Sequence, residues 1–94
     1  MQPTIRQIDT FTEIRQRIVY SVEFLLQHSC SNEIALARTH EIGSLVDSLP
    51  FATAQYGVAK NRIRNALKYF QSEEFGAASY ELRLLLGQLA RTFV

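Results

Sequence analysis

The chain has 94 residues, of which 47% are hydrophobic and 20% charged, and its ten Lys and Arg residues nearly balance its nine Asp and Glu residues. This length predicts a single domain over residues 1–94, and the composition excludes a disordered tail, a collagen-like repeat and a disulfide-rich mini-protein. No apolar run approaches the roughly 18 residues that a membrane-spanning helix needs, so no membrane partner is expected.

The single cysteine and the first residues of the chain bear on the cellular compartment. Cys30 has no second cysteine with which to form an internal disulfide, which fits a reducing compartment. Residues 1–9 lack the basic region and the apolar core of a secretory signal. Both features predict a cytoplasmic location.

Apolar residues recur at steps of three and four along most of the chain, the spacing of amphipathic helices, and no stretch alternates long enough to make a strand. The first predicted helix covers residues 10–27 and begins with the capping-box pair Thr10 and Glu13, whose side chains can each satisfy a backbone N–H. Pro3 also suits a helix start, so a single turn over residues 4–7 is a candidate extension. The expected core stripe is Ile8, Phe11, Ile14, Ile18, Val22 and Leu25.

The second predicted helix covers residues 32–49, with Ser31 as its N-cap and Pro50 as its terminator. Its apolar residues are Ile34, Ala35, Ile42, Leu45, Val46 and Leu49. Its middle is polar, and Gly43 costs the helix about 1 kcal/mol relative to alanine. This is therefore the helix with the weakest amphipathic pattern.

The last two predicted helices cover residues 51–71 and 73–92, and the turn between them is so short that they should lie antiparallel. Ser72 is the expected N-cap of the fourth helix, and Glu73 and Glu74 suit the positive end of its dipole. The expected core stripes are Ala52, Tyr56, Ala59, Ile63, Ala66 and Phe70, and then Phe75, Ala78, Leu82, Leu85, Leu89 and Phe93. The predicted fold is all-α, a compact bundle of about four helices whose last two form a tight antiparallel pair.

No combination of residues predicts catalysis. His28 and Cys30 place two soft ligands close together and His40 follows ten residues on, whereas a zinc site needs three or four ligands. The four glycines are isolated, so no phosphate-binding loop is present. Nothing near Cys30 supplies the oxyanion pocket that a nucleophilic cysteine requires. The sequence predicts a non-enzymatic protein with no metal, no cofactor and no small-molecule substrate.

The positive charge is concentrated in one segment. Residues 48–71 contain four basic residues and no acidic residue, although the chain as a whole carries a formal charge of only +1. At about 100° per residue, Lys60, Arg64 and Lys68 fall on one face of the third predicted helix. Cations and amides suit phosphate oxygens, so this face predicts contact with a nucleic-acid backbone. The candidate binding residues are Lys60, Asn61, Arg62, Arg64, Asn65 and Lys68.

Two family resemblances point the same way. Residues 51–67 resemble a helix-turn-helix motif, with Gly57 as the turn glycine and with buried positions at Ala52, Tyr56, Val58, Ile63 and Ala66. The resemblance implies a recognition helix over residues 59–70 that carries the basic residues. In size, helicity and possession of a basic helix, the chain also resembles the small all-helical subunits of CRISPR effector complexes, which touch the nucleic-acid backbone.

The competing hypothesis is protein–protein association. The first and fourth predicted helices are apolar on more than one side, whereas a helix in a four-helix bundle buries one stripe. The additional residues combine aromatic rings with a glycine that permits close approach, as interfaces do. The candidate interface residues are Tyr20, Phe24, Tyr80, Leu84 and Gly87. The sequence thus predicts a nucleic-acid-binding helical module or, alternatively, a protein-binding adaptor that forms a homodimer.

Overall fold

The computed structural model describes the backbone of residues 3–93 and the side chains of residues 10–93. Four helices follow one another along the chain: α1 (Pro3–Gln27), α2 (Asn32–Asp47), α3 (Thr53–Gln71) and α4 (Phe75–Thr92). No strand occurs in the described backbone. The predicted all-α class and the number of helices are confirmed, and none of the four helices is long and apolar enough to cross a membrane over the residues searched.

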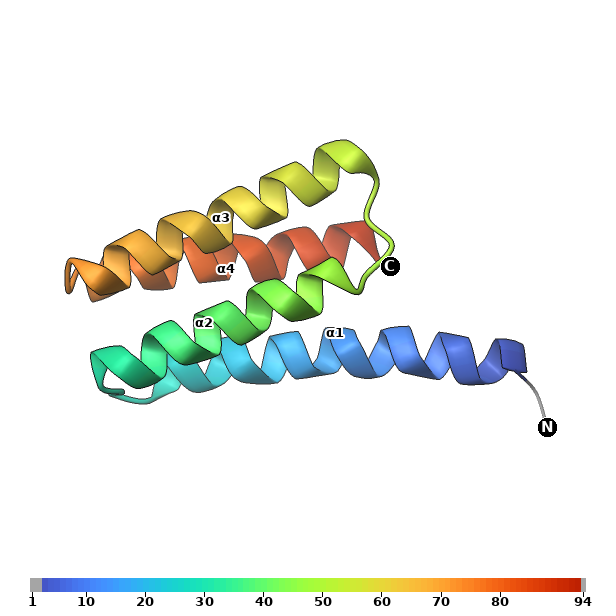
Figure 1. Cartoon of the computed structure of the whole chain (residues 1–94), viewed down its shortest axis with the longest axis horizontal. Coiled ribbons are helices and arrows are strands. Elements are labelled where there is room, and N and C mark those ends of the chain that lie inside the picture. Colours follow the sequence, from blue (N-terminus) through green and yellow to red (C-terminus); the bar gives the residue numbers. More distant parts are fainter. Residues whose placement is uncertain (1–2, 94) are drawn as a thin grey trace.

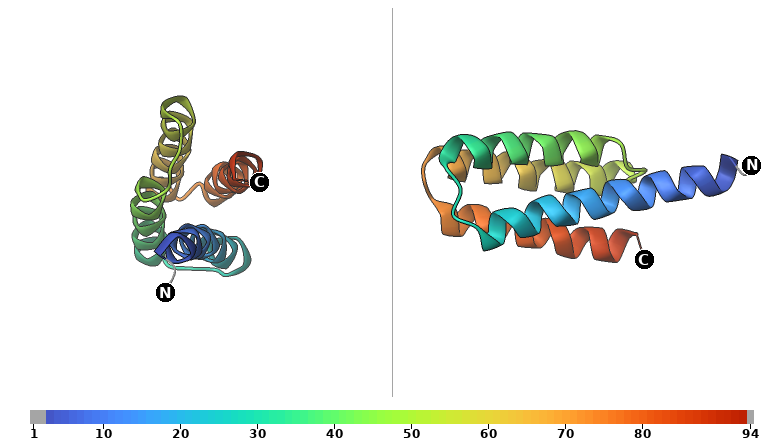
Figure 2. Two further views of the ribbon diagram at one scale, coloured as in Figure 1. Left: turned by 90° about the vertical axis from the view of Figure 1, so that its right-hand side faces the viewer. Right: turned by 90° about the horizontal axis from the view of Figure 1, so that it is seen from below.

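Each helix packs antiparallel to the next, so the chain runs up and down through the four helices (Figure 1). The closest packing is between α3 and α4, which confirms the tight final pair. Seen end-on, the helices form an open arc in the order α1, α2, α3, α4 (Figure 2). The two ends of that arc, α1 and α4, pack against each other least extensively, and this is the side of the fold on which a groove remains.

The core lies inside the arc and takes residues from all four helices. Its fully buried large side chains include Ile18, Val22, Ile42, Val46, Leu82 and Leu85. The predicted stripes are therefore correct in the middle of each helix. They overestimate burial at the helix ends, where Phe11, Ile34, Tyr56 and Phe75 are all more than a third exposed. The Ile8 side chain, also assigned to a stripe, lies outside the described residues.

One residue of the polar middle of α2, Thr39, is buried, which the hydrophobic pattern did not predict. Thr39 is fully buried, and its hydroxyl donates a 2.7 Å hydrogen bond to the carbonyl of Ala35, so its one polar group is satisfied within the helix. Gly43 is buried against α3, where a Cβ would lie 3.5 Å from Ile63 and 3.6 Å from the ammonium of Lys60. A small residue at this position lets α2 and α3 approach closely.

The start of α2 agrees with the sequence, and the starts of the other three helices differ. Ser31 caps α2 as predicted, because its hydroxyl accepts a 3.3 Å hydrogen bond from the backbone N–H of Ile34. The capping box at Thr10 is wrong, because α1 already begins at Pro3 and runs through Thr10 without a break. The helix therefore begins at Pro3, a residue type that favours the first helical position, although Thr10 has a higher propensity to be an N-cap.

Ser72 was assigned to the wrong helix. It terminates α3 rather than starting α4, since its backbone N–H and its hydroxyl both donate to the carbonyl of Lys68, at 3.1 and 3.0 Å. Glu73 then adopts a left-handed conformation with φ 58°, which turns the chain, and α4 begins only at Phe75. The two glutamates therefore form the turn and do not lie in the first helical turn of α4.

The helix-turn-helix interpretation is wrong. The α3 helix runs unbroken from Thr53 to Gln71, and no glycine of the described backbone adopts the left-handed conformation that a turn at Gly57 would use. The apolar residues of α3 keep the same helical spacing before and after Gly57, as a continuous helix requires. Pro50 and Phe51, which were expected at the start of this helix or just before it, lie in the connection that follows α2.

Candidate interaction surfaces

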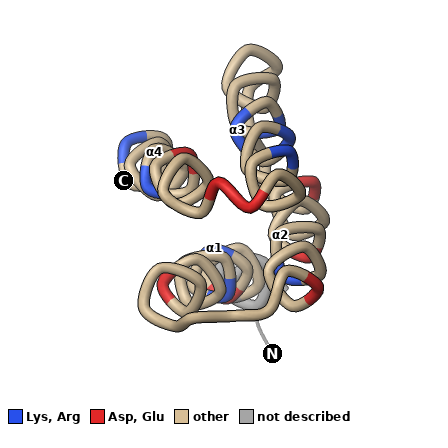
Figure 3. Tube along the Cα trace, turned by 90° about the vertical axis from the view of Figure 1, so that its left-hand side faces the viewer, with Lys and Arg blue, Asp and Glu red and all other residues tan. Residues whose placement is uncertain are grey.

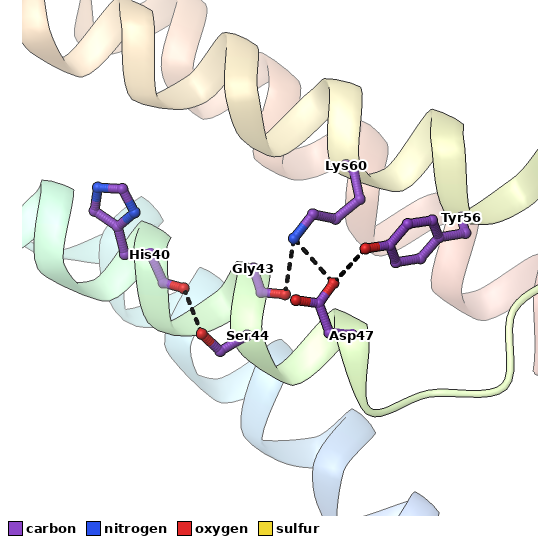
Figure 4. Close-up of polar contacts among 6 residues, drawn as sticks. All are labelled: His40, Gly43, Ser44, Asp47, Tyr56 and Lys60. Carbon is purple, nitrogen blue, oxygen red and sulfur yellow. Dashed lines mark hydrogen bonds and ion pairs between the residues drawn. The ribbon is translucent and has the colours of Figure 1, made fainter.

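Lys60 lies at the seam between α2 and α3 and is engaged by groups of α2. Its ammonium is 3.0 Å from the carboxylate of Asp47 and donates a 3.3 Å hydrogen bond to the carbonyl of Gly43 (Figure 4). The hydroxyl of Tyr56 donates a 2.6 Å hydrogen bond to the same carboxylate oxygen. These three contacts tie the start of α3 to the end of α2.

The electrostatics of this cluster keep Asp47 ionised. The hydrogen bond from Tyr56, and after it the contacts from Lys60, hold the pKa of the Asp47 carboxyl below its usual 3.8. Conversely, the hydrogen bond to Asp47 raises the pKa of the Tyr56 hydroxyl above its usual 10.0. At neutral pH the Asp47 charge therefore offsets that of Lys60, which is the first cation of the predicted basic face.

A second predicted cation faces α4. The guanidinium of Arg62 is 3.7 Å from the carboxylate of Glu81, and the two side chains are only 28% and 13% exposed. Figure 3 shows the same pattern along the molecule, with acidic positions on α2 beside the basic positions of α3 and an acidic turn between α3 and α4. Two of the four cations of α3, Lys60 and Arg62, therefore pair with acidic residues of the neighbouring helices.

The remaining members of the basic set point toward solvent. Arg64 and Lys68 are exposed, and neither forms an ion pair within the side chains that the structure describes. Asn61 is exposed and accepts a 3.3 Å hydrogen bond from the guanidinium of Arg64, whereas Asn65 is half-buried. The outward face of α3 therefore presents two cations and one amide.

A groove of about 490 Å³ lies between α1 and α4, at the open side of the arc. Its α1 wall consists of Arg15, Gln16, Val19, Tyr20 and Glu23, and its other wall consists of Leu86, Leu89 and Ala90 of α4 with Phe93 directly after that helix. Apolar side chains line its floor, and polar ones stand at its rim. Tyr20, on the rim, is 73% exposed, which makes it the most exposed of the large apolar side chains described.

The two ends of the groove carry opposite charges. At one end Arg15 donates a hydrogen bond to the carbonyl of Phe93, and its guanidinium lies 5.8 Å from the centre of the Phe93 ring. A cation suits this position because the carbonyls at a helix C-terminus carry partial negative charge. The Phe93 ring is fixed in turn by an edge-to-face contact with Phe51 at 4.9 Å. At the other end Glu23 is exposed and forms no ion pair among the described side chains.

The five predicted interface residues do not form one surface. Tyr20 lines the groove, but Phe24, one turn further along α1, does not; its ring is stacked on His28 at 4.5 Å and covered by the guanidinium of Arg38 at 3.9 Å. Tyr80 is 61% exposed. Leu84 and Gly87 are half-buried, and none of these three α4 residues lines the groove.

Sequence reasoning missed most of the groove: its polar residues Arg15, Gln16 and Glu23 and its apolar residues Val19, Leu86 and Ala90. A signal for the two α4 residues exists in the sequence, because Leu86 and Ala90 are four residues apart and form a second apolar row beside the core stripe, which ends at Phe93. That row and the core stripe share one broad apolar face. The pattern alone therefore did not separate the side chains that pack inward from those that line the groove.

No group of three or more His, Cys, Asp or Glu residues lies close enough to hold a metal ion within the described part of the chain. Comparison of the chain with protein-family models, curated proteins and solved structures finds no match. The function is therefore argued from the two surfaces just described.

Proposed function

We propose that the protein is a non-enzymatic protein-interaction module that binds a helix of another polypeptide in the α1–α4 groove. The observation that carries the proposal is the groove itself, with its apolar floor, its polar rim and the exposed ring of Tyr20. An apolar centre with a polar rim and an exposed tyrosine is the usual composition of a protein interface. A cytoplasmic location is consistent with the single Cys30.

A helix is the secondary structure that fits this groove best. Its walls are two antiparallel helices, α1 and α4 (Figure 1), and the side chains of a helix form ridges into which those of another helix can pack. A third helix placed between them would complete the packing that the open arc leaves unfinished. Ala90 in the α4 wall has a small side chain, so the incoming backbone can approach closely there.

The test uses two alanines, both exposed on helices. Ala90→Arg places a long charged side chain inside the groove, and Ala37→Arg places the same side chain on α2, outside it. Proteins that the wild-type chain retains from an extract of its source cells are identified, purified and tested for binding to each variant. We expect the wild type and Ala37→Arg to bind equally and Ala90→Arg to lose binding at least tenfold, because a buried unpaired charge is costly. Equal binding by both variants would contradict the proposal.

The nucleic-acid hypothesis remains a second candidate, supported by the exposed cations Arg64 and Lys68. With two phosphate contacts, the slope of log affinity against log salt would be roughly −2. Labelled single- and double-stranded oligonucleotides are titrated with the wild type, with Arg64→Glu/Lys68→Glu, and with the charge-matched control Arg83→Glu/Arg91→Glu on α4. Loss of binding in the first double variant alone supports this candidate. Equal loss in both, or no binding by the wild type, rejects it.

A further inference from the structure

We infer that the polypeptide filling the α1–α4 groove is a second copy of this chain, whose α1 docks antiparallel to the first about a two-fold axis at Val19. The inference rests on the proposed function, since it names the occupant of the same groove. The two α1 helices would lie side by side, and each would also lie along the α4 of the other copy. Both walls of each groove would then be covered.

The charge pattern of the groove is self-complementary. Arg15 lies four residues before Val19 and Glu23 four residues after it, which is about 6 Å along the helix in each direction. In a two-fold antiparallel pair, a residue before the axis faces the residue equally far after it. Arg15 of each copy therefore faces Glu23 of the other, and two ion pairs form. A parallel pair would instead place Arg15 beside Arg15.

The side chains at both positions are available for such pairs. The ion pairs of Glu41, Asp47 and Glu81 are made within the chain, whereas Glu23 has none among the described side chains. Arg15 donates from one nitrogen to the carbonyl of Phe93. A guanidinium has five N–H groups, so donors remain for a carboxylate.

The centre of the proposed interface is uncharged. Val19 would meet Val19 at the axis, with the exposed Tyr20 beside it and Leu86 and Ala90 of α4 opposite. Burying these apolar surfaces would supply the association energy, and the two ion pairs would set the orientation. The chain carries a formal charge of only +1, so little overall repulsion opposes the approach of two copies.

The test is analytical ultracentrifugation of the purified full chain and of charge variants, from about 1 to about 100 µM, the range of a moderate dimer affinity. We expect a wild-type dimer. Arg15→Glu and Glu23→Arg each create two like-charge contacts, so the dissociation constant should rise at least tenfold for each. Circular dichroism checks that each variant retains its helices.

Charge restoration provides the decisive control. A mixture of the Arg15→Glu protein with the Glu23→Arg protein should form a heterodimer, because every facing pair then has opposite charges. The chain that carries both substitutions should form a homodimer for the same reason. Neither restoration is expected if Arg15→Glu simply damages the contact with Phe93.

The outcomes separate the inference from the proposed function. A wild-type monomer over the whole range, or a dimer that neither charge reversal weakens, overturns the inference. A dimer that Ala90→Arg dissociates while both charge reversals leave it intact also overturns the antiparallel arrangement, and it still supports the groove as the binding site. A dimer that Ala90→Arg leaves intact counts against the groove and therefore against the proposed function itself.

Discussion

Three consecutive leucines in α4 allow a sharp test of how the helix is oriented. Leu85 is fully buried in the core, Leu86 is half-buried at the edge of the core and lines the groove, and Leu84 is half-buried on another side of the helix. Replacing each by alanine removes the same atoms from the same helix. Differences in the free energy of unfolding among the three variants therefore report on burial alone.

The expected magnitudes follow from these environments. Leu85→Ala removes a fully buried side chain and leaves a cavity, which costs about 2–5 kcal/mol. Leu84→Ala and Leu86→Ala remove side chains that already touch water, so each should cost about 1 kcal/mol. For a domain of this size, 1 kcal/mol corresponds to a change of roughly 4–8 °C in Tm.

The assay is thermal and urea unfolding followed by circular dichroism, with all proteins at one concentration because association shifts Tm. We expect Leu85→Ala to lower Tm by at least about 4 °C more than either neighbour does. Equal losses at all three positions, or the largest loss at Leu86, would refute the orientation of α4 and the position of the groove.

Two further predictions concern α3 and its contact with α2. Gly57→Ala should stabilise the chain by about 0.5–1 kcal/mol, because α3 is continuous and a Cβ at this position has nothing within 4 Å; a loss of stability on urea unfolding would contradict the unbroken helix. The lowered pKa of Asp47 means that its contacts with Tyr56 and Lys60 stabilise the fold at pH values above its ordinary pKa of 3.8, and that this contribution is lost as the pH falls through the lower folded value. The wild type should therefore be slightly more stable than Asp47→Asn at pH 7, and the difference is small because the Lys60–Asp47 pair is partly exposed. The difference should vanish in strong acid. A difference in stability that does not depend on pH would exclude ionisation of Asp47 as its cause.

The sequence predicts the helices and the core well, because both depend on local spacing. The steps of three and four through Leu82, Leu85 and Leu89 identify the inner face of α4, and all three side chains are buried. Helix ends were predicted less well. Ser72 suits both the end of one helix and the start of the next, and only the left-handed conformation of Glu73 decides between them.

The interaction surfaces depend on which helices pack against each other, and the spacing of residues within one helix does not encode that. Lys60 belongs to a basic face by its angle on α3, yet Asp47 of another helix lies 3.0 Å from its ammonium. Phe24 has the sequence character of an interface residue, yet Arg38 of α2 covers its ring. Tyr20 was predicted as an interface residue because it lies off the core stripe of its helix; the structure leaves it 73% exposed, and its groove follows only from the position of α4 beside α1.

The most direct test of the central claim is a disulfide cross-link at the proposed two-fold axis. In a Cys30→Ser background the chain has no other cysteine, so Val19→Cys places one thiol at the axis and Tyr80→Cys places one on the face of α4 outside the groove. A disulfide forms readily only where two Cα atoms come within about 7 Å. Under mild oxidation, the account predicts a covalent dimer of the Val19→Cys protein and little of the Tyr80→Cys protein. Equal cross-linking of both proteins, or cross-linking of Tyr80→Cys alone, would contradict it.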